Sequence, residues 1–142
     1  MDPSVSEDAT EQGPSDRSTI LVVDDEEPVR TLVKRVLESR GYRVLEAGDG
    51  AEALRVAEAY PSIIHLLLTD IVMPHGNGVS LSRTLVAKRP EMSVIYMSGY
   101  RADTLLLVAE VVSPKRLLTK PFTVEALVDQ IQMTLNASMS KR

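Results

Sequence analysis

The sequence of 142 residues contains no cysteine and no tryptophan, and it has a single phenylalanine. Without cysteine the chain forms neither disulfides nor zinc–thiolate sites, and this fits a protein of the reducing cytoplasm. No apolar run approaches the roughly 20 residues that a membrane-spanning helix requires. No secretory signal opens the chain. We therefore expect a cytoplasmic protein without membrane insertion.

The sequence also lacks a basic cluster, and this argues against nucleic-acid binding. Its formal net charge of −4 is unevenly distributed, because residues 1–18 hold five acids and one base and leave fifteen of each in the remainder. The first segment is rich in Ser, Pro and Gly and cannot bury enough apolar surface to order itself. We predict a disordered acidic leader or linker over 1–18, one folded domain over 19–136 and a short tail over 137–142.

Within the predicted domain, short apolar strands alternate with helical patterns. The strands are expected at 19–23, 42–47, 63–69, 93–98 and 116–119. The helices are expected at about 28–40, 50–60, 79–88, 102–112 and 123–135. Five strand–helix repeats predict an α/β fold, with a five-stranded parallel sheet and helices on both faces.

Individual residues indicate where these helices begin and end. Pro28 suits the first turn of the first helix and Gly41 its C-terminal end. Thr123 is the expected N-cap of the last helix. Glu26 and Glu27 are interpreted as first-turn acids that the helix dipole favours. The apolar residues of the first helix recur at spacings of three and four: Val29, Leu32, Val33, Val36 and Leu37.

Polar groups follow four of the predicted strands. The stretch TILVVDDEEPVR ends its apolar run on Asp24 and Asp25, and LLLTDIVMP places Asp70 at a strand end. In the same way VIYMSGY places Ser98, and LLTKPF places Lys120, at the ends of later strands. Ligands of parallel sheets bind beyond the carboxyl ends of the strands, so these five groups should converge on one rim. Clustered carboxylates favour a hard cation such as Mg²⁺.

Simpler interpretations exist for each of these residues. Asp24 and Asp25 can be helix-capping residues, Lys120 a solvated surface lysine and Ser98 a structural hydroxyl. We interpret His65 and His75 as packing or surface residues, because the sequence lacks cysteine and a helical pair of histidines. The run Gly76, Asn77 and Gly78 is interpreted as a turn that requires positive φ.

The motifs VVDDE, LLLTDIVMP, MSGY and TKPF, in that order and spacing, resemble the receiver domain of two-component response regulators, the CheY-like family. The resemblance covers residues 19 to about 136. The phrases TDIVMP, MSGYRAD and KPFTVEAL are most similar to receivers attached to hybrid sensor histidine kinases. The resemblance implies the (βα)5 flavodoxin-like fold with five helices. It also implies a phospho-accepting domain of phosphorelay signal transduction that catalyses its own phosphorylation and dephosphorylation but is not an enzyme in its own right.

The same resemblance implies how the acids act. Asp70 would accept a phosphoryl group from a partner's phosphohistidine and form an acyl phosphate. Asp25 and Asp70 would bind Mg²⁺ (or Mn²⁺) directly, together with the backbone carbonyl of Val72. Asp24 would hold a metal-bound water.

Two further groups and the partners follow from the resemblance. Lys120 would neutralise charge on the transferred group, and Ser98 would donate its hydroxyl to a phosphoryl oxygen. The Lys120–Pro121 bond is expected to be cis. The partner would be a histidine kinase or a histidine phosphotransfer domain. The basic residues of the first helix are either a docking surface for it or a plain solvated surface: Arg30, Lys34 and Arg35.

The sequence departs from the family pattern at three positions. Leu117 stands where receivers commonly carry an aromatic switch residue, so the usual aromatic–hydroxyl coupling is in doubt, and Tyr100 is a candidate substitute. Val72 and Tyr100 occupy the two positions that tune hydrolysis in the family. Neither side chain positions water well, so we predict slow self-dephosphorylation.

The helix expected at 102–112 is apolar on more than one face, and such exposed apolar surface commonly marks a partner. We expect a homodimer or an effector to use it. Two other functions remain as alternatives. One is a Mg²⁺-dependent aspartyl phosphatase, which would need a second Asp where this chain has Val72. The other is a receiver-like binding module that is never phosphorylated.

Overall fold

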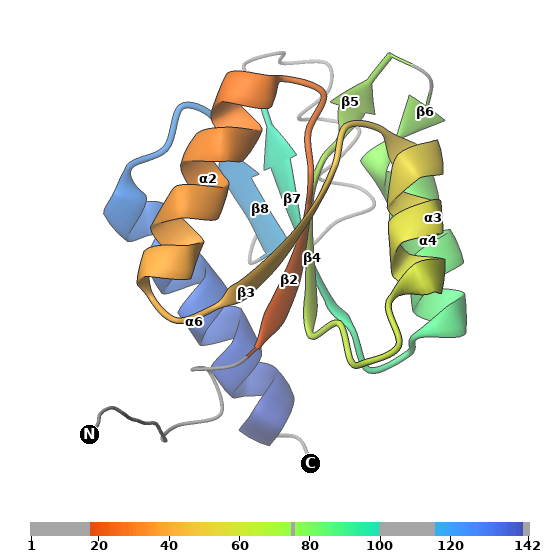
Figure 1. The fold of residues 1–142 in the computed structure, drawn as a ribbon. Coiled ribbons are helices and arrows are strands. Elements are labelled where there is room, and N and C mark those ends of the chain that lie inside the picture. Colours follow the sequence, from red (N-terminus) through yellow and green to blue (C-terminus); the bar gives the residue numbers. More distant parts are fainter. Residues whose placement is uncertain (1–17, 75, 100–115, 141–142) are drawn as a thin grey trace, which may run out of the picture.

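The computed structural model describes residues 18–74, 76–99 and 116–140, with side chains up to residue 138 (Figure 1). At its centre lies a sheet of five strands in the order β3-β2-β4-β7-β8, and every neighbouring pair is parallel. This confirms the predicted α/β fold. The strands are β2 Thr19–Val23, β3 Arg43–Ala47, β4 Leu66–Asp70, β7 Ser93–Ser98 and β8 Leu117–Thr119.

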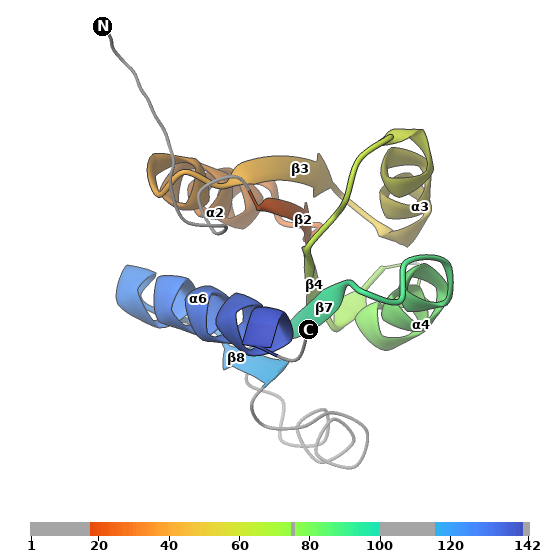
Figure 2. The same cartoon turned by 90° about the horizontal axis from the view of Figure 1, so that it is seen from below.

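Helices cover both faces of the sheet. The view from below shows α2 and α6 on one side and α3 and α4 on the other (Figure 2). No helix in the described part of the chain is long and apolar enough to span a membrane. The helix expected at 102–112, Tyr100 and His75 lie outside the described residues. The described helices are α2 Glu27–Ser39, α3 Gly50–Ala59, α4 Gly78–Lys88 and α6 Val124–Ser140.

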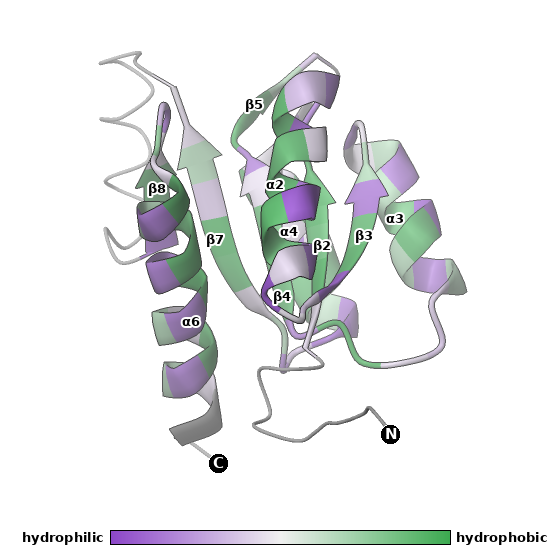
Figure 3. Ribbon diagram, turned by 60° about the vertical axis from the view of Figure 1, so that its left-hand side comes forward, coloured by the Kyte–Doolittle hydropathy of each residue, from purple (hydrophilic) through white to green (hydrophobic). Residues whose placement is uncertain are grey.

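The two faces of the central strands build two apolar clusters. Alternate residues of a strand point to opposite faces, so Ile20 and Val22 pack toward α2 and α6, while Leu21 and Val23 pack toward α3 and α4. Every residue of β2 and β4 is buried. The hydrophobic colour accordingly dominates these strands (Figure 3). Burial of each Ile, Leu or Val side chain among them contributes about 1.5–3 kcal/mol, and this anchors the strands whose ends carry the acids.

The predicted helix ends are confirmed where local chemistry sets them. Pro28 lies in the first turn of α2, and Gly41 follows the helix with a φ of 94°. Thr123 Oγ1 accepts a hydrogen bond from the backbone N–H of Ala126 at 3.0 Å, as an N-cap does. Because these signals act within a few residues, the sequence alone was sufficient to place them.

Several predicted boundaries were wrong. β4 begins at Leu66 rather than at 63, because Ile63 is 53% exposed and belongs to the preceding loop despite its apolar side chain. β3 and β8 each begin one residue later than expected. α6 continues to Ser140, since no Gly or Pro follows Leu135 to end it. A small antiparallel pair, β5 Val72–Met73 with β6 Gly76–Asn77, was not predicted.

A turn with positive φ was expected at residues 76–78, and Gly76 alone of the three has a positive φ. Gly76 has a φ of 146°, but Asn77 is extended, with a φ of −147°, and caps α4 by accepting a hydrogen bond from Ser80 N–H at 2.8 Å. Gly78 is needed for a different reason. A Cβ atom there would lie 2.2 Å from the backbone oxygen of Asp70, so only glycine lets α4 approach the end of β4.

Candidate functional site

The ends of β2 and β4 bring three carboxylates together. The two strands are neighbours, and Val23 pairs with Thr69. Asp24 directly follows Val23, and Asp70 directly follows Thr69. One carboxylate oxygen from each of Asp24, Asp25 and Asp70 lies within 4.8 Å of the other two. Asp24 and Asp70 are buried, whereas Asp25 is exposed. The rim predicted from the strand ends therefore exists for these three acids.

Lys120 inserts its ammonium group among these acids. Its Nζ lies 2.8 Å from Asp24 Oδ2 and 3.3 Å from Asp70 Oδ2. It also lies 3.4 Å from Glu26 Oε1, a contact that sequence reasoning missed because it interpreted Glu26 only as a helix acid. The Lys120–Pro121 bond is cis, as expected.

Burial and like charge set the protonation of this cluster. Burial raises the pKa of Asp70 from 3.8 to about 6; the charge of Lys120 opposes this rise, and those of Asp24 and Asp25 add to it. Burial by itself would lower the pKa of Lys120, but its hydrogen bond to Asp24 and the charges of Asp70 and Asp24 raise the pKa overall. The ammonium is thus firmly protonated, and the cluster keeps an excess of negative charge.

Hydrogen bonds hold Asp24 from several sides. Its backbone N–H donates to the carbonyl of Ala47 at 3.2 Å, which extends the ladder between β2 and β3. Its Oδ1 accepts a hydrogen bond from Glu26 N–H at 2.9 Å, and its Oδ2 accepts one from Lys120. The N-cap residue of α2 is Glu26, without a side-chain cap hydrogen bond, so the helix-capping alternative does not describe Asp24. One oxygen of Asp24 bonds the backbone N–H of Glu26, and the other faces the site.

Ser98 lies at the same rim but makes no hydrogen bond to Asp70. It follows Met97, the register partner of Asp70, and it is buried. Its hydroxyl donates to the carbonyl of Gly99 at 3.3 Å. Its own carbonyl accepts from the backbone N–H of Lys120 at 2.7 Å, which ties the ends of β7 and β8 together.

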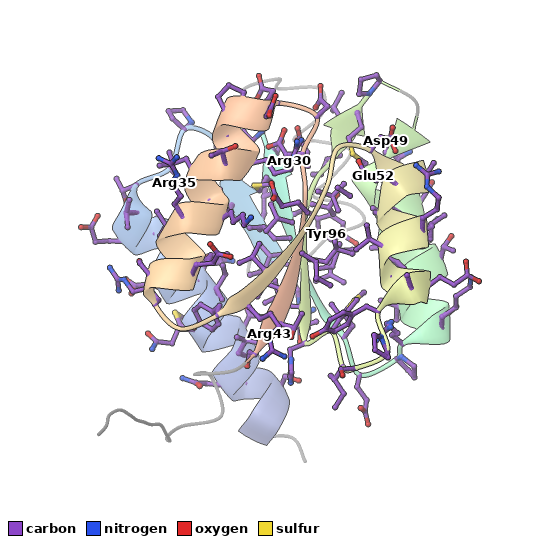
Figure 4. The ribbon with its side chains drawn as sticks, viewed as in Figure 1. Arg30, Arg35, Arg43, Asp49, Glu52 and Tyr96 are labelled. Atoms are coloured by element: carbon purple, nitrogen blue, oxygen red, sulfur yellow. The ribbon has the colours of Figure 1, made fainter. Side chains whose placement is uncertain are left out.

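The positions at which the sequence departs from the family pattern are partly described. Val72 lies two residues past Asp70 in β5, and its side chain is 56% exposed beside the site. Leu117 pairs with Tyr96 across β7 and β8. Tyr96 lies in the middle of the molecule (Figure 4), and its hydroxyl hydrogen-bonds the Ser82 hydroxyl at 2.6 Å. An aromatic ring therefore lies beside Leu117, although it comes from another strand.

His65 belongs to the opposite end of the sheet. Its Nδ1 accepts a hydrogen bond from the backbone N–H of Thr19 at 2.9 Å, and the backbone N–H of His65 donates to the Thr19 carbonyl. This agrees with a packing role. Among the described residues, the three-acid group at the other end is the one cluster with the geometry of a metal site.

These donors fit a magnesium ion. Mg²⁺ binds one or two protein carboxylates and keeps several waters, and it prefers oxygen ligands. The cluster offers three carboxylates, one of them exposed to solvent and open to ligands from outside. The ammonium of Lys120 at present offsets part of their charge, and a divalent ion would offset more.

Comparisons with known proteins agree with this geometry. The family model described as the response regulator receiver domain matches residues 20–132. The chain is 35% identical over 121 residues to the sensor kinase CckA of Brucella abortus, an alignment that covers 85% of this chain and 13% of that protein. It is 32% identical over 119 residues to the response regulator receiver protein CpdR of the same organism, covering 84% of this chain and 98% of CpdR.

A solved structure agrees as well. The crystal structure of a response regulator receiver domain protein from Clostridium thermocellum matches with a TM-score of 0.76 and 29% identity, over 88% of this chain and 99% of that one. Because the chain spans only 13% of CckA, the comparison says nothing about the remainder of such a kinase. The resemblance inferred from the four motifs is confirmed: the chain belongs to the response regulator receiver domain family, which acts in two-component signalling.

Proposed function

We propose that this chain accepts a phosphoryl group on Asp70 from the phosphohistidine of a histidine kinase or histidine phosphotransfer domain. The observation that supports this most strongly is the meeting of three carboxylates and one ammonium at a single sheet rim. Asp70 is the suitable nucleophile because it ends the central strand β4 and both its burial and its neighbours are fixed.

Mg²⁺ (or Mn²⁺) is the proposed cofactor. Asp25 and Asp70 would bind it directly with the backbone carbonyl of Val72, and Asp24 would bind through a water. When bound, the ion supplies positive charge that neutralises the oxygens of the transferred group and orients that group for in-line transfer.

In the proposed transfer step, one Asp70 carboxylate oxygen forms a bond to phosphorus. The phosphorus–nitrogen bond to the partner's imidazole breaks, and the imidazole keeps the electron pair and takes up a proton. Lys120 moves its hydrogen bond from Asp70 to a phosphoryl oxygen, a short displacement for a side chain already 3.3 Å away. Ser98 exchanges its bond to the Gly99 carbonyl for one to another phosphoryl oxygen. These two donors act by electrostatic stabilisation.

The proposed output is a change of partner-binding surface. A phosphoryl group adds about 1.5–2 negative charges at the end of β4. Once Lys120 turns toward that charge, its contacts with Asp24 and Glu26 weaken, and the loops that carry them are released to a second arrangement. A homodimer or an effector that uses 102–112 remains part of this proposal.

The extent of the domain and its location also belong to the proposal. We place the receiver at 19–136, with a disordered leader or linker before it and a short tail over 137–142, into which α6 continues as far as Ser140. We place its action in the cytoplasm. Limited proteolysis followed by mass spectrometry tests the first boundary, since cleavage should be confined to residues before Thr19 when the domain is folded.

Mass spectrometry of the intact protein tests the proposed function. The protein is incubated with acetyl phosphate and MgCl₂, and we expect the mass of one phosphoryl group to be added. Asp70→Asn should abolish the addition. Asp49→Asn is the matched control, because Asp49 lies at the same edge of the sheet but caps α3 instead of joining the cluster. Addition to Asp70→Asn would contradict the proposal because another residue would then accept the group. No addition to the wild type would also contradict it and would favour the binding module.

A further inference from the structure

We infer that Arg30 is a positioning residue that fixes the peptide plane between Asp24 and Asp25 and thereby aims Asp25 at the metal site. This inference rests on the proposed function, because it concerns the same site. The sequence alone groups Arg30 with Lys34 and Arg35 as a docking or solvated surface. The contacts of Arg30 assign it a different role.

Arg30 links the end of β2 to β3. Its NH1 donates to the backbone carbonyl of Asp24 at 2.7 Å, and its Nε donates to Glu46 Oε1 at 3.3 Å. Glu46 is held from the other side by Lys34, at 3.2 Å. The Arg30 side chain is only 18% exposed. Arg30 and Arg35 lie on different sides of α2, Arg30 toward the sheet and Arg35 toward the outside (Figure 4).

The carbonyl that Arg30 binds is the one that matters for Asp25. The Asp24 carbonyl and the Asp25 nitrogen belong to one planar peptide unit, so holding the oxygen fixes the plane from which Asp25 departs. The Asp24 N–H, at the other side of the residue, is already fixed by Ala47. Rotation of the Asp24–Asp25 peptide is thereby blocked.

The Asp25 carboxylate needs such a constraint more than its neighbours do. Asp24 and Asp70 both bond Lys120, and both are buried. Asp25 is exposed, and no hydrogen bond or ion pair within the described residues holds its carboxylate. Its direction toward the other two acids is therefore inherited from the backbone, which Arg30 holds.

Arg30 can hold this plane without competing with a metal. Its guanidinium stays charged at all relevant pH values and uses two donors of a rigid fork on two acceptors, a carbonyl and Glu46. Neither acceptor is a carboxylate oxygen of the three-acid cluster. The arrangement is comparable to the outer hydrogen bonds that orient metal ligands, whose removal typically weakens metal binding 10- to 100-fold.

Binding of Mn²⁺ to the full chain tests this role, with free Mn²⁺ measured by electron paramagnetic resonance. Arg30→Ala should raise the dissociation constant about 10-fold. Lys34→Ala is the matched control, because it removes the same charge from the same helix and from the same Glu46 but makes no contact with Asp24. It should change the constant by less than about twofold. Arg30→Lys, which keeps the charge but loses the fork, should lie between the two.

Equal binding by Arg30→Ala and the wild type would overturn the inference. Equal weakening by Lys34→Ala and Arg30→Ala would also overturn it, since the effect would then be one of charge alone. If Arg30→Ala does not fold, the comparison of Arg30→Lys with Lys34→Ala decides, and Arg30→Lys must bind Mn²⁺ more weakly.

A second measurement separates this inference from the proposed function. In the metal-free protein, the amide ¹⁵N resonance of Asp25 reports the hydrogen bond on the preceding carbonyl. It should shift in Arg30→Ala and stay in place in Lys34→Ala. If the wild type binds no Mn²⁺ but this shift occurs, the metal site fails and the positioning of the peptide stands. If the wild type binds Mn²⁺ and the resonance does not move, the positioning role fails alone.

Discussion

The two ends of the parallel sheet satisfy their polar groups in different ways. At the amino end, the Thr19 N–H donates to His65 Nδ1 and the Thr19 hydroxyl bonds the Tyr60 hydroxyl, at 2.9 and 3.2 Å. These two hydrogen bonds join neutral groups. At the carboxyl end, Asp24 and Asp70 share one ammonium group at 2.8 and 3.3 Å. Three clustered carboxylates face one ammonium group there, so an excess of negative charge remains.

Two cations make the same contrast. Arg89, near the amino end, donates to the backbone carbonyls of Ser62, Ala57 and Tyr60 at 2.9, 2.8 and 2.9 Å. Lys120, at the carboxyl end, donates to three carboxylates: Asp24, Glu26 and Asp70. Arg89 closes loops, and nothing in its surroundings calls for a ligand. The acids around Lys120 leave an excess of negative charge, and that excess marks the end of the sheet at which we propose that a cation binds.

Replacing the cation at each end should give the largest difference in the free energy of unfolding between the two ends. Lys120→Gln leaves buried Asp24 without its partner, and we expect a loss of about 3 kcal/mol in the free energy of unfolding without metal. MgCl₂ should restore part of it. Arg89→Gln should cost less and show no response to MgCl₂, since it removes hydrogen bonds to carbonyls. Urea titration measures both. Equal responses of the two variants to MgCl₂ would remove the distinction between the ends.

The Asp70 carboxyl should make the carboxyl end sensitive to pH. Its pKa is raised to about 6 in the folded protein, so the folded state binds the proton more tightly than the unfolded chain. Ionised Asp70 therefore opposes folding, and stability from this group is full below about pH 4 and lost as pH rises through 6. In metal-free protein, Asp70→Asn should add up to about 3 kcal/mol at pH 8 and almost nothing at pH 4.

The measurement is urea titration of both proteins across that pH range. A constant difference between Asp70→Asn and the wild type at all pH values would show that ionisation of Asp70 carries no cost in the fold.

Self-dephosphorylation should be slow and should depend on Val72. The exposed isopropyl group beside Asp70 offers no hydrogen bond to an attacking water. Val72→Asn adds an amide that positions water, and we expect the phosphorylated protein to decay about tenfold faster, which corresponds to about 1.4 kcal/mol. Loss of the phosphoryl mass with time measures this. A rapid decay of the wild type, unchanged by the substitution, would refute it.

The amino end should give the smallest effect and should ignore the metal. Thr19→Val removes the hydroxyl that bonds Tyr60, and we expect a cost of about 1 kcal/mol. Because Thr19 lies at the opposite end of β2 from Asp24, the cost should be the same with and without MgCl₂. A metal-dependent cost would mean that the two ends are coupled through the strand.

The sequence was sufficient to predict the residues at the strand ends. Asp24, Asp25, Asp70 and Lys120 each follow a short apolar run, and a parallel sheet collects the carboxyl ends of its strands at one edge. Topology thus converts four local signals into one cluster. Ser98 was also placed at this edge, but its hydroxyl bonds Gly99, a choice that depends on a rotation no sequence pattern specifies.

The sequence pattern did not predict side-chain contacts between different helices and strands. In the sequence, Glu26 looks like any acid at the start of a helix. Its ion pair with Lys120 forms only because the fold brings the end of β8 close to it. The position of Arg30 in the helical pattern is that of a solvated residue. Its hydrogen bond to the Asp24 carbonyl at the end of β2 depends on how α2 packs beside that strand. The sequence favours a turn at Gly78, because it does not reveal how closely α4 approaches the backbone of Asp70. Each miss concerns tertiary geometry rather than local propensity.

The most direct test of the central claim is the effect of Mg²⁺ on stability. At constant ionic strength and about pH 8, adding about 10 mM MgCl₂ should raise the free energy of unfolding of the wild type by about 1.4 kcal/mol if the dissociation constant is about 1 mM. Asp25→Asn, which removes one carboxylate from the cluster, should lose most of that gain. No gain in the wild type, or an equal gain in Asp25→Asn, would contradict a metal site at this end of the sheet.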